Sequence, residues 1–320
     1  MANLLPYTKP HKTSRELCQK LVDQNLTIED LPKAIKILDR CSYYRFKAYL
    51  IPFQNEDKTF REEASFDKAN QLYEFDNELR NTLFRFIASV EIGVRSKFEQ
   101  WMTEKTGNTF WYLDTSLFAN SDNHIRTVSN VRSAFVDSKE LFASHFRNKY
   151  FNEFCPFYRD LPPAWIAIEL MTFGNLTKLL EGMTEDSIET HKLNRFAQKV
   201  GVKNFKSLAS WMATIQEVRN HCGHHTRLFN RNLKSPTGIK RILKPEIDLV
   251  KHSISGGREE DQLNRLYTAV AAIQKIYTGL GYSDRLGPII NQLFVTYPVT
   301  NFVKKSMGFP ERWTEEPLLF

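Results

Sequence analysis

The sequence predicts an all-α protein, and three observations support this fold class. Apolar residues recur at intervals of three and four in several long segments, as they do along one face of an α-helix. Strand-like alternation of useful length does not occur. Glycine and proline number only 13 each in 320 residues, whereas 42% of the residues are hydrophobic. We therefore expect a globular helical chain with a sizeable core, and neither a collagen-like nor a disordered one.

The first sixty residues predict two helices followed by an aromatic segment. Thr13 to Glu16 fits a capping box, in which a threonine and a glutamate three residues later bond each other's backbone. Thr27 to Asp30 opens a second helical pattern. Ser42 to Tyr49 is rich in aromatic and basic side chains, and a charged loop follows. We place a boundary near residue 60, so that residues 1–60 form an N-terminal helical region.

The longest predicted helix runs from Phe66 to about Lys105. Its apolar positions recur every three or four residues, with no proline and one glycine. Glu91 and Arg95 interrupt this apolar face one helical turn apart, which is the spacing of an ion pair. The pair fits either a surface salt bridge or polar residues that line a site.

The rest of the chain predicts shorter helices. Residues 106–160 have no clear period and indicate short helices and loops. Prolines within Leu161 to Trp165 suit a helix start, and Phe173 to Leu176 indicates a bend before the next helix. Two further helices follow from apolar spacing, one through residues 208–222 and one from about residue 261 to residue 276.

Positive charge is concentrated in one segment. The formal net charge is +7, and residues 219–251 carry eight Lys or Arg against two acidic residues, a local balance of +6. Such a concentration is typical of a surface that binds a polyanion, because neutralising phosphates supplies the sequence-independent part of nucleic-acid affinity. A solvated basic loop is the alternative. The side chains that we expect to contact RNA are Arg227, Arg231, Lys234, Lys240 and Arg241.

Composition also argues against several other classes. The N-terminus lacks the basic and then apolar pattern of a secretory signal, and the uncharged stretch from Leu286 to Val303 is interrupted by polar residues and prolines. The four cysteines, at positions 18, 41, 155 and 222, form no Cys-x-x-Cys pair, so neither a disulfide framework nor a zinc knuckle is expected. We expect a cytoplasmic protein without membrane contact and without a cofactor.

The run from Arg219 to His225, with the sequence Arg-Asn-His-Cys-Gly-His-His, is the predicted chemical site. On a helical wheel Asn220 and His224 fall opposite the apolar set, Arg219 lies at its flank and His225 falls nearer the core. An exposed imidazole can move protons near neutral pH, and a guanidinium can stabilise a phosphate as its charge develops. We therefore expect Arg219, Asn220 and His224 to cleave RNA without a metal, with the 2′-hydroxyl as nucleophile.

One geometric difficulty accompanies this prediction. On an ideal helix Arg219 and His224 would lie about 140° apart around the axis, which disfavours their convergence on one phosphate. Either Gly223 ends the helix, or two copies of the chain complete each other's site.

Two other interpretations use the same residues. His221 and His225 are four residues apart with Cys222 beside the first, a spacing compatible with zinc. However, no carboxylate lies between the histidines as it does in zinc proteases, and no second Cys/His cluster is visible, so we predict no metal site. Alternatively, the histidines only cap the C-terminus of a helix and complement its dipole.

The motif, extended through Arg227 to Asn230, resembles the signature of the AbiD/AbiF-like family of bacterial abortive-infection proteins, Arg-Asn-x-Cys-(small)-His-His-x-Arg-Leu-x-Asn. Phe229 stands where tryptophan is commoner in that family. Other landmarks of the family follow in the same order along nearly the whole chain, namely Tyr43-Tyr-Arg45, Leu72 to Asp76 with Leu79-Arg80, Glu91 with Arg95, Leu161 to Trp165 with Glu169, Phe173-Gly174, and Met307 to Pro310 with Trp313.

The resemblance implies a HEPN-like helical core, here residues 61–232, followed by a basic linker and C-terminal helical region at 233–320. Ribonucleases of this kind use an arginine, four to six variable residues and a histidine, which match Arg219 and His224, with Asn220 as the polar neighbour. His225, Glu91 and Arg95 are expected to support them.

The resemblance also implies partners and a role. It implies a homodimer that brings two motifs together, defence against phage by cutting RNA, and for some relatives control by a small non-coding RNA. Because HEPN folds include RNA binders without activity, a non-catalytic regulator that holds a structured small RNA is the alternative.

Overall fold

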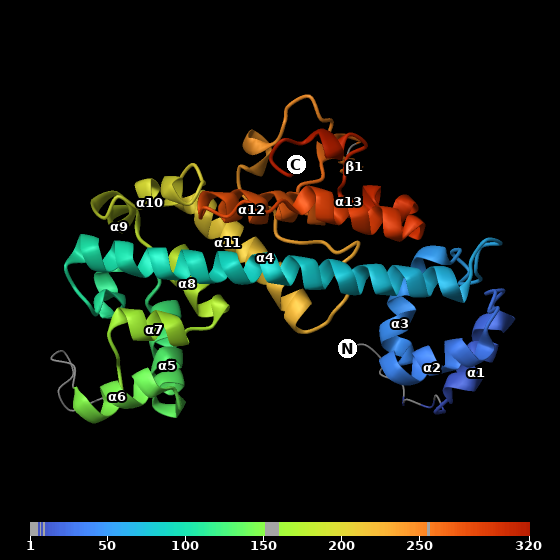
Figure 1. Ribbon diagram of the computed structural model, residues 1–320, viewed down its shortest axis with the longest axis horizontal. Helices are drawn as coiled ribbons and strands as arrows, with labels where there is room; N and C mark the ends of the chain where they lie inside the picture. The colour runs from blue at the N-terminus through green and yellow to red at the C-terminus, as the bar shows by residue number, and fades with distance from the viewer. Residues whose placement is uncertain (1–5, 7, 9, 151–159, 255–256) are drawn as a thin grey trace. The chain divides into compact units, whose positions relative to one another are not determined.

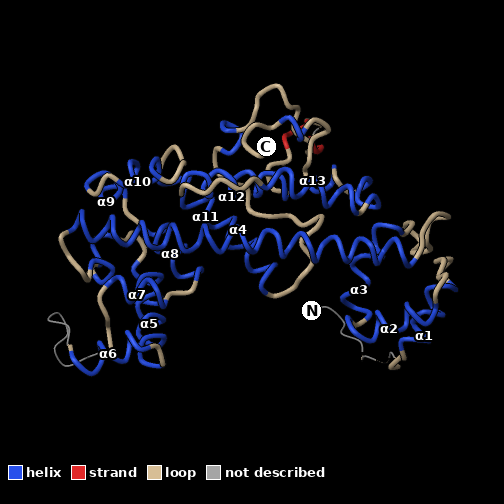
Figure 2. The backbone as a smooth tube through the Cα atoms, viewed as in Figure 1, coloured by secondary structure: helices blue, strands red, loops and turns tan. Residues whose placement is uncertain are grey.

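The structure, a computed structural model, describes residues 6, 8, 10–150, 160–254 and 257–320 (Figure 1). Helices dominate these residues, and the predicted all-α fold class is confirmed (Figure 2). A short antiparallel pair of strands, β1 (Lys251–Ser253) and β2 (Glu259–Asp261), is the β-sheet of the described chain. The α-helices are α1 (Ser14–Asp23), α2 (Leu31–Cys41), α3 (Tyr43–Leu50), α4 (Phe66–Thr106), α5 (Ser121–Asp137), α6 (Leu141–Lys149), α7 (Ala164–Leu170), α8 (Phe173–Gly182), α9 (Glu185–Thr190), α10 (Leu193–Lys199), α11 (Phe205–Gly223), α12 (Leu266–Gly279) and α13 (Leu286–Thr296).

The chain divides into two compact units. The smaller unit contains residues 1–79 and 293–302, and the larger contains residues 80–292 and 303–320. The division of the sequence near residues 60 and 232 stays a prediction. Every predicted site residue lies in the larger unit.

The smaller unit begins with the predicted helix cap. The Thr13 hydroxyl accepts the backbone N–H of Glu16, and the Glu16 carboxylate accepts the backbone N–H of Thr13, which is a capping box. Helix α2 starts later than the pattern at Thr27 indicates, because the Asp30 carboxylate caps it. Farther on, the buried hydroxyl of Tyr49 donates to the Asp76 carboxylate at 2.7 Å and so joins α3 to α4.

Within the larger unit, α11 packs against α8 and α12, and α8 packs against α5. Gly174 lets α8 approach α11 closely, since a Cβ there would lie 3.2 Å from the side-chain nitrogen of Gln216. The bend predicted at residues 173–176 lies instead just before Phe173, where the Thr172 side chain caps α8. The sequence placed it too late because Gly174 suggested a turn, whereas the glycine serves helix packing.

Most of α12 is buried, as expected for a helix that is apolar on nearly all sides. Its far end meets the chain after α10, where a Cβ at Gly279 would lie 2.3 Å from the carbonyl oxygen of Val200. This contact requires a glycine. In the part of the chain that the structure describes, each helix is too short or too polar to cross a membrane.

Candidate active site

Helix α11 carries the predicted motif and ends within it. The Asn204 side chain caps its start, and the predicted apolar positions from Leu208 to Cys222 are buried. At the other end the His225 N–H donates to the carbonyl of Cys222 at 3.1 Å, and the Thr226 N–H donates to that of His221 at 3.0 Å. These two bonds form a Schellman motif, which ends a helix.

The helix end changes where the histidines lie. His224 is the C-cap residue, and His225 adopts the left-handed conformation, with φ of +53°, that glycine usually supplies in a Schellman motif. Both side chains are exposed. The prediction that His225 lies nearer the core is therefore wrong, because the helical wheel extended α11 beyond Gly223. Asn220 is only half-buried, and its backbone carbonyl accepts the His224 N–H at 2.9 Å.

Arg219 is held by a carboxylate from another helix. Its Nε lies 3.6 Å from one oxygen of Glu91, while the other oxygen of Glu91 accepts a bond from Arg95 at 2.8 Å. The Glu91 side chain is only 15% exposed, whereas that of Arg219 is 37% exposed. The predicted pairing of Glu91 with Arg95 is confirmed, and the structure adds Arg219 as the third member.

Arg95 joins this cluster to α7. Its guanidinium donates to the backbone carbonyls of Ile168, Glu169 and Met171, with Met171 at 2.7 Å, at the C-terminal end of that helix. Such carbonyls carry the negative end of the helix dipole, and a cation there is favourable. The buried Arg95 therefore fixes Glu91, and through it Arg219, relative to α7.

His221 has a defined environment on the last turn of α11. The hydroxyl of Thr226 lies 2.7 Å from its Nδ1, and a terminal nitrogen of Arg231 lies 3.5 Å from the same atom. Because arginine can only donate, Nδ1 is the acceptor and the ring proton sits on Nε2. Burial, followed by the charge of Arg231, lowers the pKa of His221 and favours the neutral ring.

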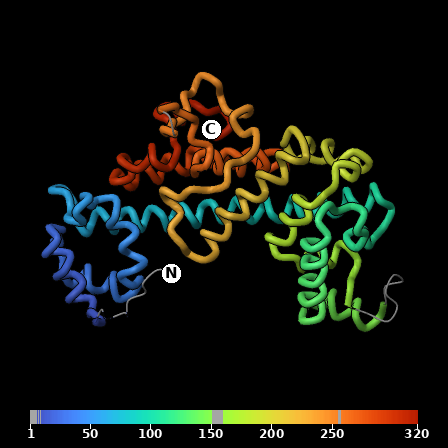
Figure 3. Tube along the Cα trace, turned by 180° about the vertical axis from the view of Figure 1, so that it is seen from behind, coloured from blue at the N-terminus to red at the C-terminus, as the bar shows by residue number. Residues whose placement is uncertain are grey.

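The part of the basic segment that follows residue 223 turns back along α11 (Figure 3). The Lys234 N–H donates to the Glu217 carboxylate at 2.8 Å, and the Lys234 carbonyl accepts a hydrogen bond from the Thr214 hydroxyl. Farther along, the Trp211 indole donates to the carbonyl of Thr237 at 2.9 Å. These bonds fix the backbone of the segment, so that the exposed side chain of Lys234 stands beside α11.

The predicted RNA contacts have different partners in the structure. Arg227 lies over the ring of Phe229, 5.3 Å from its centroid. Arg231 faces His221, and Lys240 forms an ion pair with Asp261. Arg241 is exposed on the short 3-10 helix Ile239–Ile242.

Sequence reasoning missed Thr226, Glu217 and Phe84. The ring of Phe84, on α4, lies 3.8 Å from the place of a Cβ at residue 223, so it borders the motif. Phe84 is 42% exposed, which is unusual for a residue within an apolar helical pattern. Only the hydroxyl of Thr226, next to a histidine-rich run, offered a local signal.

The side chain of Arg219 can bind an anion, and that of His224 can move protons. Among the described residues, no hydrogen bond or ion pair joins Arg219 to His224, and the terminal nitrogens of Arg219 take part in no hydrogen bond. Residues 10–150, 160–254 and 257–320 contain no group of three or more His, Cys, Asp or Glu side chains placed to hold a metal ion.

Fold and motif together define a helical protein in which α11 ends in an arginine–histidine run. A largely buried Glu–Arg pair on α4 contacts the arginine of this run. A family model described as Abi-like protein matches residues 36–230, which include this run and the Glu91–Arg95 pair. The chain belongs to the Abi-like family. No curated protein and no solved structure gives a significant match. Membership of this family indicates a role in abortive-infection defence and is compatible with a nuclease.

Proposed function

We propose that the protein is a metal-independent endoribonuclease of bacterial defence against phage, with a HEPN-like core. One observation carries the proposal. Glu91 lies 3.6 Å from the buried Nε of Arg219, which leaves the terminal N–H groups of Arg219 for a ligand, and the imidazole of His224, five residues later, is exposed. A guanidinium held in this way matches the geometry of a phosphate.

Each residue then has a role. His224 takes the proton from the RNA 2′-hydroxyl, whose oxygen attacks the adjacent phosphorus, and Arg219 stabilises the charge that develops on the phosphate. Asn220 orients one of these groups. The bond from phosphorus to the 5′-oxygen of the next nucleotide breaks, and this oxygen takes up the proton that His224 returns through water, so the products carry 2′,3′-cyclic phosphate and 5′-hydroxyl ends.

A homodimer is part of this proposal. Phe84, Ala88 and Ile92 are exposed on α4 at intervals of four, so they form one apolar stripe. The Phe84 ring borders Gly223 at the end of α11. A second copy packed on this stripe would bring its own Arg219 and His224 to the same place, which answers the wide separation expected on one helix.

The role in defence follows from the family and the chemistry together. Cutting cellular RNA during infection would arrest growth of the host and deny the phage a place to replicate. A small non-coding RNA held by the basic segment would restrain the enzyme until then.

The experiment is cleavage of labelled single-stranded RNA by the purified protein in the presence of EDTA. Arg219→Ala and His224→Ala should each reduce cleavage by roughly 100-fold or more, and mass spectrometry should find cyclic phosphate ends. His221→Gln is the matched control, since it removes a neighbouring histidine of the same helix end. Cleavage that EDTA abolishes, or that both alanine variants retain, contradicts the proposal.

The same experiment tests a non-catalytic RNA-binding regulator. Its basis is the basic segment that lies along α11, with Lys234 and Arg241 exposed. Tight RNA binding by both wild type and His224→Ala, with no cleavage of any RNA tested, would favour this function.

A further inference from the structure

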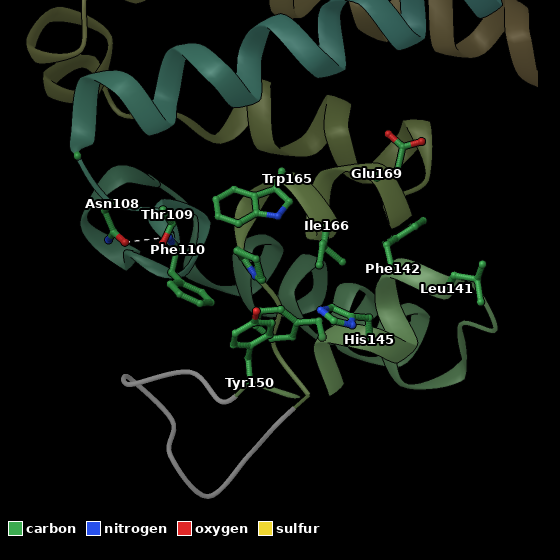
Figure 4. Close-up of a pocket in the computed structure, with 13 residues that line it drawn as sticks. Asn108, Thr109, Phe110, Leu141, Phe142, His145, Tyr150, Trp165, Ile166 and Glu169 are labelled. Atoms are coloured by element: carbon green, nitrogen blue, oxygen red, sulfur yellow. Dashed lines mark hydrogen bonds between the residues drawn. The ribbon is translucent and has the colours of Figure 1, made fainter. Parts of the chain in front are cut away.

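A large cavity lies beside α7, in the larger unit and outside the candidate active site (Figure 4). Its volume is about 1220 Å³, above the roughly 300–1,000 Å³ of most small-molecule pockets. Its walls come from α6, α7 and the residues that follow α4. The cavity therefore has room for more than one small ring system.

Aromatic rings dominate the walls. Six of the thirteen lining residues are Phe, Tyr, Trp or His, and Figure 4 shows the ring of Trp165 on one side with those of Tyr150 and His145 on the other. Trp165 is 51% exposed and Tyr150 is 44% exposed. Aromatic side chains that are partly exposed in this way can stack on a planar ligand.

Part of this wall is rigid before any ligand arrives. Phe146 and Ile166, which both line the cavity, pack in a core cluster with Phe135. The Tyr150 ring contacts those of Phe146 and His145, with centroids 5.5 and 5.9 Å apart. A preformed aromatic wall loses little entropy on binding.

The inside of the cavity and its surroundings carry charges of opposite sign. Glu169 is the one charged residue among the described lining residues, so a phosphate would not be favoured within. At the rim, the ammonium of Lys149 lies 5.3 Å from the centroid of the Tyr150 ring. Inside, the Asn108 carboxamide oxygen accepts the Phe110 N–H at 2.8 Å, so its NH₂ group remains to donate to a ligand.

We infer that this cavity binds unpaired nucleobases, stacked between Trp165 and Tyr150, with their phosphates outside near Lys149. Aromatic rings, an amide donor and a nearby cation, here the six aromatic side chains, Asn108 and Lys149, are among the elements by which proteins hold single-stranded nucleic acid. The size favours a short stretch of RNA over a free nucleotide as the source of the base. An apolar helical peptide fits less well, because it would bury Glu169 and the NH₂ group of Asn108 without a polar partner.

The test is a binding titration that does not depend on cleavage. The His224→Ala protein is mixed with a fluorescein-labelled RNA decamer, with the same decamer lacking its bases, and with free AMP, GMP, CMP or UMP. Binding should be tightest for the intact decamer. Trp165→Leu should weaken it by roughly 5- to 150-fold, as expected for loss of one stacked base, whereas Trp165→Phe should retain most of it. Tyr44→Leu, which removes an exposed aromatic ring of the smaller unit, is the control.

Several outcomes would overturn the inference. The first is equal affinity for the decamer with and without its bases. The second is an unchanged affinity of Trp165→Leu for the intact decamer. The third is that a leucine-rich helical peptide quenches tryptophan fluorescence whereas neither RNA decamer does. Free nucleotides binding as tightly as the decamer would overturn RNA as the source and retain the base-binding site. A second readout rests on the proposed function: Trp165→Leu should raise KM for RNA cleavage and leave kcat nearly unchanged. Failure of the enzyme to cut RNA leaves the binding result standing.

Discussion

The carboxylate of Glu91 on α4 lies 3.6 Å from the Nε of Arg219 on α11, and this contact orients the arginine that we assign to the phosphate. Under the proposed function, Glu91 is a positioning residue. Its second oxygen is occupied by Arg95, so both oxygens of the carboxylate have cationic partners. A substitution of Glu91 should therefore change the orientation of Arg219 without removing a group that we assign to the RNA.

Glu91→Gln should slow RNA cleavage by up to roughly 5-fold, because it removes a partly exposed ion pair of about 1 kcal/mol at 3.6 Å that orients Arg219. The pH profile of kcat should keep its shape, because His224 is unchanged. Steady-state kinetics between pH 5 and 9 measure both. Glu104→Gln, on the same helix and beside Lys105, is the control. A full rate in Glu91→Gln would show that Arg219 needs no support.

Arg95→Met should lower the free energy of unfolding by about 3 kcal/mol, because it leaves the carbonyls at the end of α7 without their cation and the half-buried Glu91 with one partner fewer. In a unit of this size the loss corresponds to a decrease of roughly 6–12 °C in Tm. Scanning calorimetry measures it. Lys97→Met, at an exposed position on the same helix, should change Tm little. Equal Tm values for the two variants would mean that Arg95 contributes no net stability.

His225→Gly should raise the free energy of unfolding by about 0.5–1 kcal/mol. The left-handed conformation costs a histidine more than it costs a glycine, even after the extra freedom of glycine in the unfolded chain is counted. His224→Gly is the matched control, since φ of −90° at that position suits any residue, and it should reduce stability. Urea unfolding of both variants gives the comparison. A less stable His225→Gly would show that contacts of the imidazole outweigh the backbone strain.

Acid should destabilise the protein through His221. Its pKa is lowered from 6.5 in the folded state by burial and by Arg231, so the unfolded chain binds the proton more readily. The free energy of unfolding should therefore fall as the pH drops below about 6.5, and should level off below the folded pKa. Urea unfolding from pH 8 to pH 5 should show a shallower decline in His221→Gln than in wild type. Parallel curves would assign the acid sensitivity to other groups.

Ile92→Glu should separate the proposed dimer into monomers. It places a charge at the C-terminal end of the exposed stripe on α4, and burying that charge between two copies is costly. Sedimentation velocity measures the mass, and RNA cleavage should fall with it if the site is shared. Lys97→Glu, at an exposed position on the opposite side of α4, is the control. A monomeric wild-type protein that cleaves RNA would contradict the two-copy site.

Much of the architecture was predictable because it depends on local spacing. The long helix α4, the capping box at Thr13 and the helix that carries Arg219 all follow from periodicity or capping chemistry within a few residues. The pairing of Glu91 with Arg95 was predictable for the same reason, since the two are one turn apart. The link from Glu91 to Arg219 spans 128 positions of sequence, and no local pattern encodes it.

The end of α11 shows how a local rule can fail. Glycine normally occupies the left-handed position after a helix, so Gly223 was the natural candidate for it. The chain instead uses His225 there and keeps Gly223 in the last helical turn, near the Phe84 ring and the Arg219 guanidinium. The left-handed position therefore lies two residues beyond Gly223, and the side chain of His225 is exposed like that of His224.

The bonds from Arg95 to the carbonyls of α7 have a consequence for local opening of the protein. A helix of seven residues is too short to persist by itself, so its backbone amides gain protection from solvent mainly through its neighbours. Because the same guanidinium holds Glu91, α7 and the arginine site should open and close as one cooperative unit. Amide hydrogen exchange should then report equal opening free energies for α7 and for the last turn of α11, and a ligand that protects one should slow exchange in the other.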